Sequence, residues 1–302
     1  MNGIETKKLS LAVIIPTLDR EKSLIRTLKS VLIQTVQPVE IIVVDQSDTV
    51  SDKVKNFCRE HDITFVHLAE KGSHRARNKG LTLAAADIVF FCDDDCDLHA
   101  EVLERHRENY CDRRVGAVGG RLIQPLEKYL NHAEIKPGTF NRWTGKITGK
   151  FYSTRKTTID HFSGGNCSCR RTVLMQAGGY DENFGGNAFF EETDVALRIG
   201  KLGYKIVFEP DAFVIHLHCE SGGNRIQKMD QWVYWYSANY LLLFTRHGKT
   251  LGIPILCARL LIRWLWWSLR HKSTTVGFAG ARGFLDRCKN RESHRPKNSY
   301  KL

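Results

Sequence analysis

Three consecutive carboxylates, Asp93, Asp94 and Asp95, follow an apolar run that predicts a strand over Asp87–Cys92. Side chains alternate along an extended chain, so Asp93 and Asp95 project to the same side. Two carboxylates facing one way suit Mg²⁺ or Mn²⁺, with substrate phosphates completing the coordination. The alternative is that Asp95 or Asp97 caps a helix that follows. Mutual repulsion among three adjacent carboxylates favours the metal site.

Arg77 lies near the start of a helix predicted over Ser73–Ala86, for which Ser73 is a plausible N-cap. Arg75 and Arg77 place positive charge where the helix dipole favours negative charge. A phosphate bound at this end would remove the conflict. Arg77 is therefore either a phosphate ligand or an ordinary solvated arginine, and the sequence leaves both open.

Two adjacent glutamates, Glu191 and Glu192, begin a helix predicted over Glu191–Lys201. At about 100° per residue they flank the apolar stripe of that helix, so both can face a cleft. Asp194 is rotated away and can pair with Arg198 four residues on. A positioned carboxylate can act as a general base. The alternative is that both glutamates only complement the helix dipole.

Other polar residues have simpler explanations. Cys167 and Cys169 lack a partner cluster for a metal and are expected to pack in the core. His216 and His218 follow a predicted strand and are expected to be hydrogen-bonded core residues. Five aromatic residues are expected to pack along a helix and not to form a sugar platform: Trp232, Tyr234, Trp235, Tyr236 and Tyr240.

The elements that position these groups alternate between strand and helix through the first hundred residues. Strands are expected over Ala12–Pro16, Glu40–Asp45, Thr64–Leu68 and Asp87–Cys92, with helices over Ser23–Gln34, Ser51–His61 and Ser73–Ala86 between them. This order predicts an α/β fold with a doubly wound, mostly parallel sheet covered by helices on both faces. Ligands bind at the carboxyl ends of the strands in such sheets. Acidic residues follow three of these strands here: Asp19, Asp45 with Asp48, and Asp93–Asp95.

The second part of the chain is less regular. Residues 125–160 are polar and weakly patterned, and we expect a mobile loop there. Beyond them we expect a turn at Gly164-Gly165-Asn166, a short helix from Arg171, and strands over Tyr204–Phe208 and Ala212–Ile215.

Composition limits the class of protein. The 302 residues are 42% hydrophobic and 26% charged, which excludes wholesale disorder. The nine cysteines include no paired Cys-x-x-Cys set, which favours a reduced, cytosolic protein without structural zinc. The apolar run Leu9–Pro16 is interpreted as a strand and not as an export signal.

The net charge of +12 is concentrated at the C-terminus, where residues 251–302 hold eleven lysines and arginines against two acidic residues. A helix predicted over Pro254–Arg270 places Arg259, Arg263 and Arg270 on one stripe, with apolar residues over much of the rest. It is too short and too charged for a confident membrane span. We expect an interfacial helix at the inner face of a membrane. The alternative is that it packs on the catalytic domain.

The ordered motifs resemble family 2 inverting glycosyltransferases with the GT-A fold. The resemblance runs from about Leu11 to Ser221, and its motifs come in the family's order. They are Ile15-Pro16-Thr17-x-Asp19-Arg20, Val44-Asp45, Gly72-x-x-x-Ala76-Arg77-Asn78-x-Gly80, Asp93-x-Asp95, Gly164-Gly165-Asn166 with Arg170, Gly178-Gly179-Tyr180-Asp181-Glu182, Glu191-Glu192-x-Asp194 with Arg198, Gly203-Tyr204 and His216.

The resemblance implies a role for each matching residue. Donor binding would fall to Thr17, Asp19, Arg20, Asp45, Arg77, Asn78, Asp93 and Asp94. Asp93, Asp95 and His216 would hold Mn²⁺ or Mg²⁺, and Gly165, Asn166 and Glu191 would line the sugar and acceptor side. Glu192 would be the general base, at a position where family members usually carry aspartate.

The sequence therefore predicts a metal-dependent inverting glycosyltransferase that moves a sugar from a nucleotide-sugar to a lipid-linked or polysaccharide acceptor. We expect a catalytic domain over residues 1–225, with a nucleotide-sugar half over 1–124 and an acceptor half over 125–225, and a basic helical region over 226–302. A nucleotidyltransferase is the enzymatic alternative. A membrane or nucleic-acid binding module is the other, although acidic strand ends argue against nucleic acid as a partner.

Overall fold

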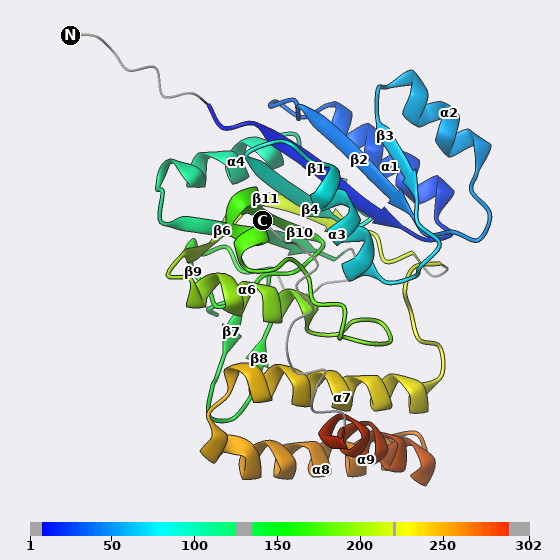
Figure 1. Cartoon of the computed structure of the whole chain (residues 1–302), viewed down its shortest axis with the longest axis vertical. Helices are drawn as coiled ribbons and strands as arrows, with labels where there is room; N and C mark the ends of the chain where they lie inside the picture. Colours follow the sequence, from blue (N-terminus) through cyan, green and yellow to red (C-terminus); the bar gives the residue numbers. More distant parts are fainter. Residues whose placement is uncertain (1–7, 125–134, 220–221, 290–302) are drawn as a thin grey trace.

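The computed structural model describes residues 8–124, 135–219 and 222–289 (Figure 1). Its first hundred residues fold as the sequence predicts. Strands β1 (Leu11–Thr17), β2 (Glu40–Asp45), β3 (Thr64–His67) and β4 (Ile88–Cys92) alternate with helices α1 (Glu21–Leu32), α2 (Asp52–Glu60) and α3 (Ser73–Leu83). β1 pairs in parallel with both β2 and β4, and β2 pairs in parallel with β3. The carboxyl ends of these strands therefore meet at one edge.

The sheet continues through further strands, of which the sequence patterns predicted only β11. Its order is β3-β2-β1-β4-β10-β6-β11-β5, with β9 (Thr157–Thr158) paired to β11. β10 (Asn166–Arg170) lies antiparallel between β4 and β6 (Val115–Ile123), so the two parts of the chain share one sheet. The expected strands 204–208 and 212–215 are a single strand, β11 (Lys205–His216), with an irregularity in its register.

The segment after the acidic loop is a strand and not the beginning of a helix. β5 (Cys96–Leu98) pairs with the end of β11, and helix α4 begins only at Val102 and ends at Glu108. A short 3₁₀ helix, η1, spans Asn109–Cys111. The alternative considered for this segment, in which Asp95 or Asp97 caps a helix, is therefore wrong, because strand pairing determines the local structure.

Part of the expected mobile loop is ordered. Residues 125–134 lie outside the described structure, but β7 (Thr139–Phe140) and β8 (Ile147–Thr148) form a hairpin within it. Asn141 Oδ1 accepts two backbone N–H bonds in the hairpin turn. The Tyr240 hydroxyl donates to the carbonyl of Gly145 and fixes the hairpin to the C-terminal helices. Long-range contacts of this kind leave no periodic pattern in the sequence.

Two apolar clusters cover the opposite faces of the sheet. Alternate residues of β1 divide between them, with Ile14 in one cluster and Val13 in the other. Cys167 and Cys169 are fully buried in the first cluster, as expected for core residues. Helix α5 (Arg171–Gln176) follows β10, and α6 (Glu191–Lys201) carries the two predicted glutamates.

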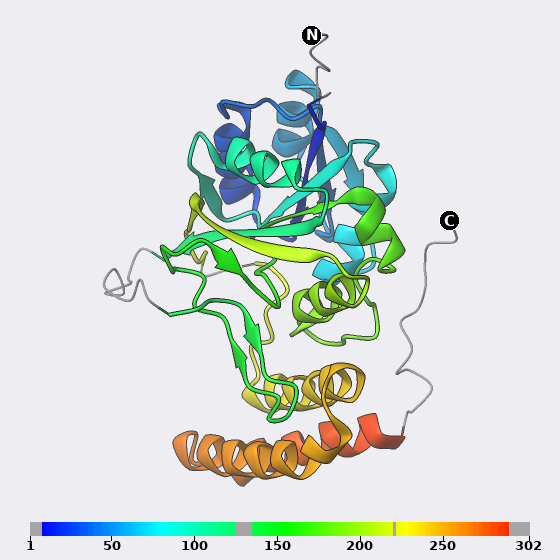
Figure 2. The same cartoon turned by 90° about the vertical axis from the view of Figure 1, so that its left-hand side faces the viewer.

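The C-terminal helices form a separate layer below the sheet. α7 (Met229–His247) lies between the catalytic part and the helices α8 (Ile253–Arg270) and α9 (Thr274–Lys289), as both views show (Figures 1 and 2). A 3₁₀ turn, η2 (Thr250–Gly252), joins α7 to α8. The aromatic residues of α7 pack as predicted, since Tyr236 and Tyr240 are buried in a third apolar cluster.

An ion-pair network fixes α7 to α6. Asp194 of α6 is fully buried and lies 2.8 Å from Arg198, as predicted, and 2.8 Å from Nε2 of His247. Arg246 of α7 approaches Asp194 to 3.3 Å and also pairs with Asp181. Burial would raise the pKa of Asp194, but the surrounding cations lower it. The helix that carries the glutamates is therefore held to the C-terminal layer by charge as well as by packing.

Helix α8 buries one face and exposes the other. Leu256, Leu260, Trp264 and Trp267 are buried within the layer. The stretch Thr250–Arg270 has the length and composition of a membrane span, with a mean hydropathy of 1.2 and 22% of it buried. The helix therefore packs on the protein with one face and exposes apolar residues on the other, so the two alternatives considered for it occur together.

Candidate active site

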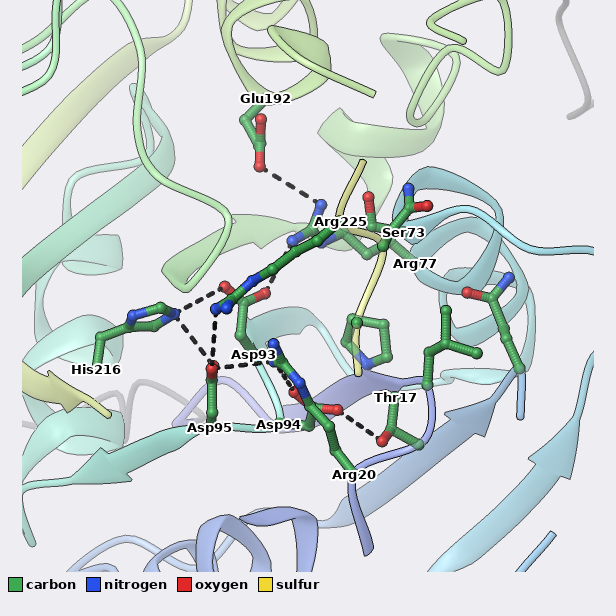
Figure 3. Close-up of a pocket in the computed structure, with 15 residues that line it drawn as sticks. Thr17, Arg20, Ser73, Arg77, Asp93, Asp94, Asp95, Glu192, His216 and Arg225 are labelled. Atoms are coloured by element: carbon green, nitrogen blue, oxygen red, sulfur yellow. Dashed lines mark hydrogen bonds and ion pairs between the residues drawn. The ribbon is translucent and has the colours of Figure 1, made fainter. Parts of the chain in front are cut away.

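The loop between β4 and β5 carries the three acidic residues, and strand pairing brings His216 beside them (Figure 3). Because β5 runs antiparallel to the end of β11, His216 lies opposite Cys96. Its Nε2 is 3.1 Å from Asp95 Oδ1 and 3.7 Å from Asp93 Oδ2. The structure therefore brings His216 to Asp93 and Asp95, the two residues with which the resemblance groups it.

Asp94 points away from its two neighbours, as the alternation of side chains predicts. Its Oδ2 accepts a 2.7 Å hydrogen bond from Thr17 Oγ1, and its Oδ1 lies 2.8 Å from Arg20. Arg20 also lies 3.0 Å from Asp95 Oδ2. Burial raises the pKa of Asp94 to about 6, although Arg20 and Thr17 oppose the shift. Asp94 therefore ties the acidic loop to the end of β1.

Asp93, Asp95 and His216 fit a divalent cation. Asp95 Oδ1 is buried, and within the described residues its near partner is His216 Nε2, at 3.1 Å but without good hydrogen-bond geometry. Burial would raise the pKa of Asp95, but His216 and Arg20 lower it to about 2. Burial would likewise lower the pKa of His216, yet Asp93 and Asp95 raise it to about 10. A protonated imidazole thus balances two carboxylates, and a divalent cation would take the place of that proton, because only the neutral imidazole can donate to a metal. Carboxylate oxygens and a neutral imidazole suit Mn²⁺ or Mg²⁺.

Cys96 also lies near this cluster but is a poor ligand. Its sulfur falls within 4.8 Å of ligand atoms on Asp95 and His216. However, the thiol is oriented toward the carbonyl of Gly165, 3.5 Å away, and burial raises its pKa well above the ordinary value. The thiolate needed for metal binding is therefore disfavoured.

Arg77 is buried in an ion-pair network and is not a solvated arginine. It pairs with Glu191, lies 3.2 Å from Asp93 Oδ1 and lies 3.6 Å from Glu192 Oε1. Ser73 is not the N-cap of α3, because Gly72 holds that place and the Ser73 hydroxyl donates to Glu191 Oε1 at 2.8 Å. The positive charge at the start of α3 is thus balanced by protein carboxylates.

Glu192 faces the same pocket from α6. Burial and the neighbouring Glu191 raise its pKa to about 7, although Arg77 opposes the shift. About a quarter of its side chain remains exposed. A Cβ at Gly164 would lie 2.6 Å from Glu192 Oε1, so glycine there leaves room for the carboxylate. A carboxylate with this pKa suits proton transfer near neutral pH.

These groups line a cavity of about 270 Å³ at the carboxyl edge of the sheet (Figure 3). Glu192 lies across it from Asp95. Its lining comprises Pro16, Thr17, Leu18, Arg20, Gln46, Ser73, Arg77, Asp93, Asp94, Asp95, Glu192, His216, Gly223, Asn224 and Arg225.

Comparison with known proteins decides the family. The model of "Glycosyl transferase family 2" matches residues 12–178, which is more than half of the chain. The chain belongs to glycosyl transferase family 2. It is a glycosyltransferase, in agreement with the resemblance seen in its motifs.

Several curated relatives are similar to this glycosyltransferase. A glucosyl-dolichyl phosphate glucuronosyltransferase of Haloferax volcanii is 28% identical over 218 residues, which cover 69% of each chain. A pre-mycofactocin glycosyltransferase of Mycobacterium tuberculosis is 25% identical over 86% of this chain, which spans only 53% of that relative. A GalNAc(5)-diNAcBac-PP-undecaprenol beta-1,3-glucosyltransferase of Campylobacter jejuni is 29% identical over 59% of this chain and 56% of its own.

Solved structures share the fold. The mannosyltransferase PcManGT from Pyrobaculum calidifontis, in complex with GDP-Man and Mn²⁺, superposes with a TM-score of 0.59, 18% identity and coverage of 94% of this chain and 88% of its own. GalNAc-T7 with UDP, GalNAc and Mn²⁺ gives a TM-score of 0.60 at 16% identity, over 79% of this chain and 51% of its own. The GT-A-like α/β fold expected from the motifs is confirmed.

Six of the residues predicted for the glycosyltransferase site do not line the cavity. Asp19 is exposed on the loop after β1, Asp45 is buried and accepts the N–H of Ser47, and Gly165 lies directly behind Asp93. The other three are buried in structural contacts. Asn78 binds the backbone of Tyr180, and Asn166 binds carbonyls of Arg121 and Ala212 as well as His106. Glu191 pairs with Arg77.

Several lining residues of the glycosyltransferase were not predicted. Arg225 approaches Asp95 Oδ2 to 3.9 Å, and Asn224 lies beside it in the lining. The backbone N–H of Gly223 donates to the carbonyl of Leu18 at 2.8 Å, which brings this segment over the loop after β1. In the sequence, the adjacent glycines Gly222 and Gly223 were the available signal for a sharp turn. In the structure both have φ near +74°.

Proposed function

We propose that this chain is a metal-dependent inverting glycosyltransferase that uses a nucleotide-sugar donor and a lipid-linked or polysaccharide acceptor. The observation that carries the proposal is that Glu192 lies across one cavity from Asp93, Asp95 and His216. A base and a metal-binding cluster on opposite walls are what a single in-line displacement requires. Such a displacement inverts the anomeric configuration, because the acceptor attacks the face opposite the leaving nucleoside diphosphate.

The metal-binding cluster would act on the leaving group. Asp93, Asp95 and His216 would hold Mn²⁺ or Mg²⁺, which neutralises developing phosphate charge when bound. The surrounding residues keep the cluster in place. Arg77 contacts Asp93, and Arg20 contacts Asp95. The solved structures that hold Mn²⁺ support a divalent cofactor of this kind.

Glu192 would take the proton of the acceptor hydroxyl. Its raised pKa, about 7, makes it a stronger base than an ordinary glutamate while leaving much of it ionised near neutral pH. A positioned general base contributes roughly 10²–10⁴-fold to the rate. Glu191 is occupied by Arg77, Ser73 and the His74 imidazole, so it would position the site and not accept the proton.

The donor nucleotide would lie along the ends of β1 and β2. Thr17, Arg20 and Gln46 line that part of the cavity. Asp19 and Asp45 would act from its rim, at the positions that match the family motifs. Gly165 would form the floor behind Asp93, where a Cβ would lie 2.9 Å from its Oδ2.

The acceptor side would face a membrane at the cytoplasmic surface. Two of the curated relatives carry dolichyl phosphate or PP-undecaprenol in their names. Leu261, Leu265 and Leu269 of α8 are exposed, at 55%, 66% and 78%. Such a face suits peripheral attachment to lipid. Leu261→Glu combined with Leu265→Glu should reduce flotation with vesicles; unchanged flotation would contradict this attachment.

A catalytic domain over residues 1–225 and a helical region over 226–302 remain the proposed division, and α7 begins at Met229, just beyond it. The halves 1–124 and 125–225 would contribute the donor and acceptor walls. Because both halves build one continuous sheet, they would act as a single rigid body.

A thermal-shift screen tests the enzymatic proposal. Nucleoside diphosphates and nucleotide-sugars are added with and without Mn²⁺, since a ligand that binds the native state raises its stability. We expect a shift for one base, dependent on Mn²⁺ and absent in Asp95→Asn. A folded protein that responds to no member of the panel would overturn the proposal, and a response limited to nucleoside triphosphates would favour the nucleotidyltransferase.

A further inference from the structure

A second cavity, of about 500 Å³, opens between α7 and α8 in the C-terminal helical layer. Tyr240 of α7 forms one wall, and five residues of α8 form the rest: Arg259, Leu260, Ile262, Arg263 and Trp266. None of these residues lines the catalytic cavity. The second cavity combines two guanidinium groups with an apolar and aromatic wall.

The two arginines have no carboxylate to neutralise them. In the described part of the chain, no carboxylate oxygen lies within 4.0 Å of Arg259 or Arg263. The sequence has no aspartate or glutamate between Asp230 and Asp286. Uncompensated positive charge beside a cavity raises the local concentration of anions.

Aromatic rings hold Arg263 in place without neutralising its charge. Its guanidinium carbon lies 5.3 Å from the centre of the Tyr236 ring and 5.5 Å from that of Trp267, and it donates a hydrogen bond to the Tyr236 hydroxyl. A guanidinium has five N–H donors, so most remain for a ligand. Stacking therefore prepares Arg263 to bind an oxyanion, the chemistry for which arginine is best suited.

The remaining wall extends toward the exposed surface of α8. Ile262 and Trp266 line the cavity and are 68% and 52% exposed, and Leu261 and Leu265 continue the apolar surface outside it. A free phosphate would leave this wall uncovered. A ligand with a phosphate at one end and a long apolar chain would contact both parts.

The cavity also borders the start of the catalytic helix. The Tyr240 ring lies 5.2 Å from the ring of Phe190, the residue that immediately precedes α6. Glu192 lies in the first turn of that helix and faces the catalytic cavity. A ligand held at α8 is thus connected through one ring pair to the element that presents the proposed base.

From these observations we infer that the cavity between α7 and α8 binds the phosphate group of a long-chain lipid phosphate, the carrier end of the acceptor. This inference rests on the proposed function, and it names the acceptor class that the enzyme would take. The phosphate lies against Arg259 and Arg263, and the hydrocarbon chain follows Ile262 and Trp266 into the membrane.

Vesicle binding by the full-length protein tests the inference. Phosphatidylcholine vesicles contain undecaprenyl phosphate, undecaprenol, or phosphatidylglycerol adjusted to the same surface charge as the first. We expect undecaprenyl phosphate to increase binding about tenfold over both of the others, since two charge-assisted arginine contacts are added to the apolar contact. Equal binding to phosphatidylglycerol and undecaprenyl phosphate would mean attraction by diffuse charge only, and would overturn it.

A pair of double variants locates the effect. Arg259→Gln with Arg263→Gln should abolish the increment, while Lys272→Gln with Arg282→Gln, which removes the same charge from exposed positions outside the cavity, should retain it. Equal losses in both double variants would overturn the inference. Nucleotide binding with Mn²⁺ is measured on the same samples. Its absence in the wild type would contradict the proposed function, whereas intact nucleotide binding with no lipid-phosphate increment would contradict this inference alone.

Discussion

The two cavities of this glycosyltransferase use arginine in opposite ways. Arg20 and Arg77 in the catalytic cavity are each paired with carboxylates and are almost completely buried. Arg259 and Arg263 in the helical layer are stacked on aromatic rings or open to the cavity, without a carboxylate within 4.0 Å in the described chain. The surroundings of an arginine, and not its residue type, therefore decide whether it organises the protein or awaits a ligand.

The largest expected effect comes from Glu192, the proposed base, which lies across the catalytic cavity from Asp95. Glu192→Gln should reduce turnover by roughly 10²–10⁴-fold while donor binding is kept, because it removes proton transfer and leaves the acidic cluster intact. Single-turnover rates at saturating donor provide the measurement. The comparison variant is Glu191→Gln. It should lower the melting temperature, since it removes an ion-pair partner of the buried Arg77. Near-native turnover of Glu192→Gln would show that the base is elsewhere.

The second-largest effect should come from removing a carboxylate of the proposed metal-binding cluster, which should weaken binding of the donor nucleotide. Asp95→Asn is expected to weaken Mn²⁺-dependent nucleotide binding by at least about a hundredfold, because it removes a charged oxygen ligand. Isothermal titration calorimetry with and without Mn²⁺ measures the loss. Asp97→Asn, two residues after Asp95 and partly exposed, is the matched control. Unchanged affinity in Asp95→Asn would contradict the metal assignment.

The contrast between arginines predicts a difference in stability. Arg77→Gln should cost about 3 kcal/mol of unfolding free energy, because Glu191 is left buried without its cation. Arg259→Gln should change it by no more than about 0.5 kcal/mol, as it breaks no ion pair. Urea denaturation of both variants measures the difference. Similar losses would show that Arg259 is also structural, and the comparison would fail.

The pH dependence should be the smallest effect. Glu192 must be deprotonated to act, and burial raises its pKa to about 7, so kcat/KM should fall about tenfold per pH unit below 7 and level above it. A raised carboxyl pKa also stabilises the protonated native state. The melting temperature of the wild type, compared with that of Glu192→Gln at the same pH, should therefore fall as pH rises from about 4.5 to 7. If kcat/KM does not begin to fall near pH 7 as the pH is lowered, Glu192 is not the titrating base.

Periodic patterns in the sequence predicted the first half of the fold well. The β-branched run Glu40–Asp45 and the apolar spacing of α1 act locally, so neighbouring residues are sufficient to identify them. β10 reads Asn-Cys-Ser-Cys-Arg and β5 has three residues, and neither carries a strand pattern of its own. Their structure comes from pairing with strands distant in sequence.

The candidate site was predicted to a similar extent. Asp93 and Asp95 were found because adjacent carboxylates after a strand are a local pattern. The pairing of Arg77 with Glu191 joins residues 114 apart, and no local pattern marks it. The position of Arg225 over Asp95 depends on the turn at Gly222 and Gly223. The sequence contained the residues that make these long-range contacts, but no local pattern showed which of them would meet.

The buried contacts of Asp194 limit how the molecule can be divided. A chain shortened after residue 225 would lose Arg246 and His247, leave this carboxylate with Arg198 alone and uncover the apolar side of α6 that α7 covers. The layer formed by α7, α8 and α9 is therefore not an appendage to a self-sufficient catalytic part. A substitution in α7 can disturb α6 without touching the catalytic cavity, because Arg246 and His247 supply the ionic support of Asp194.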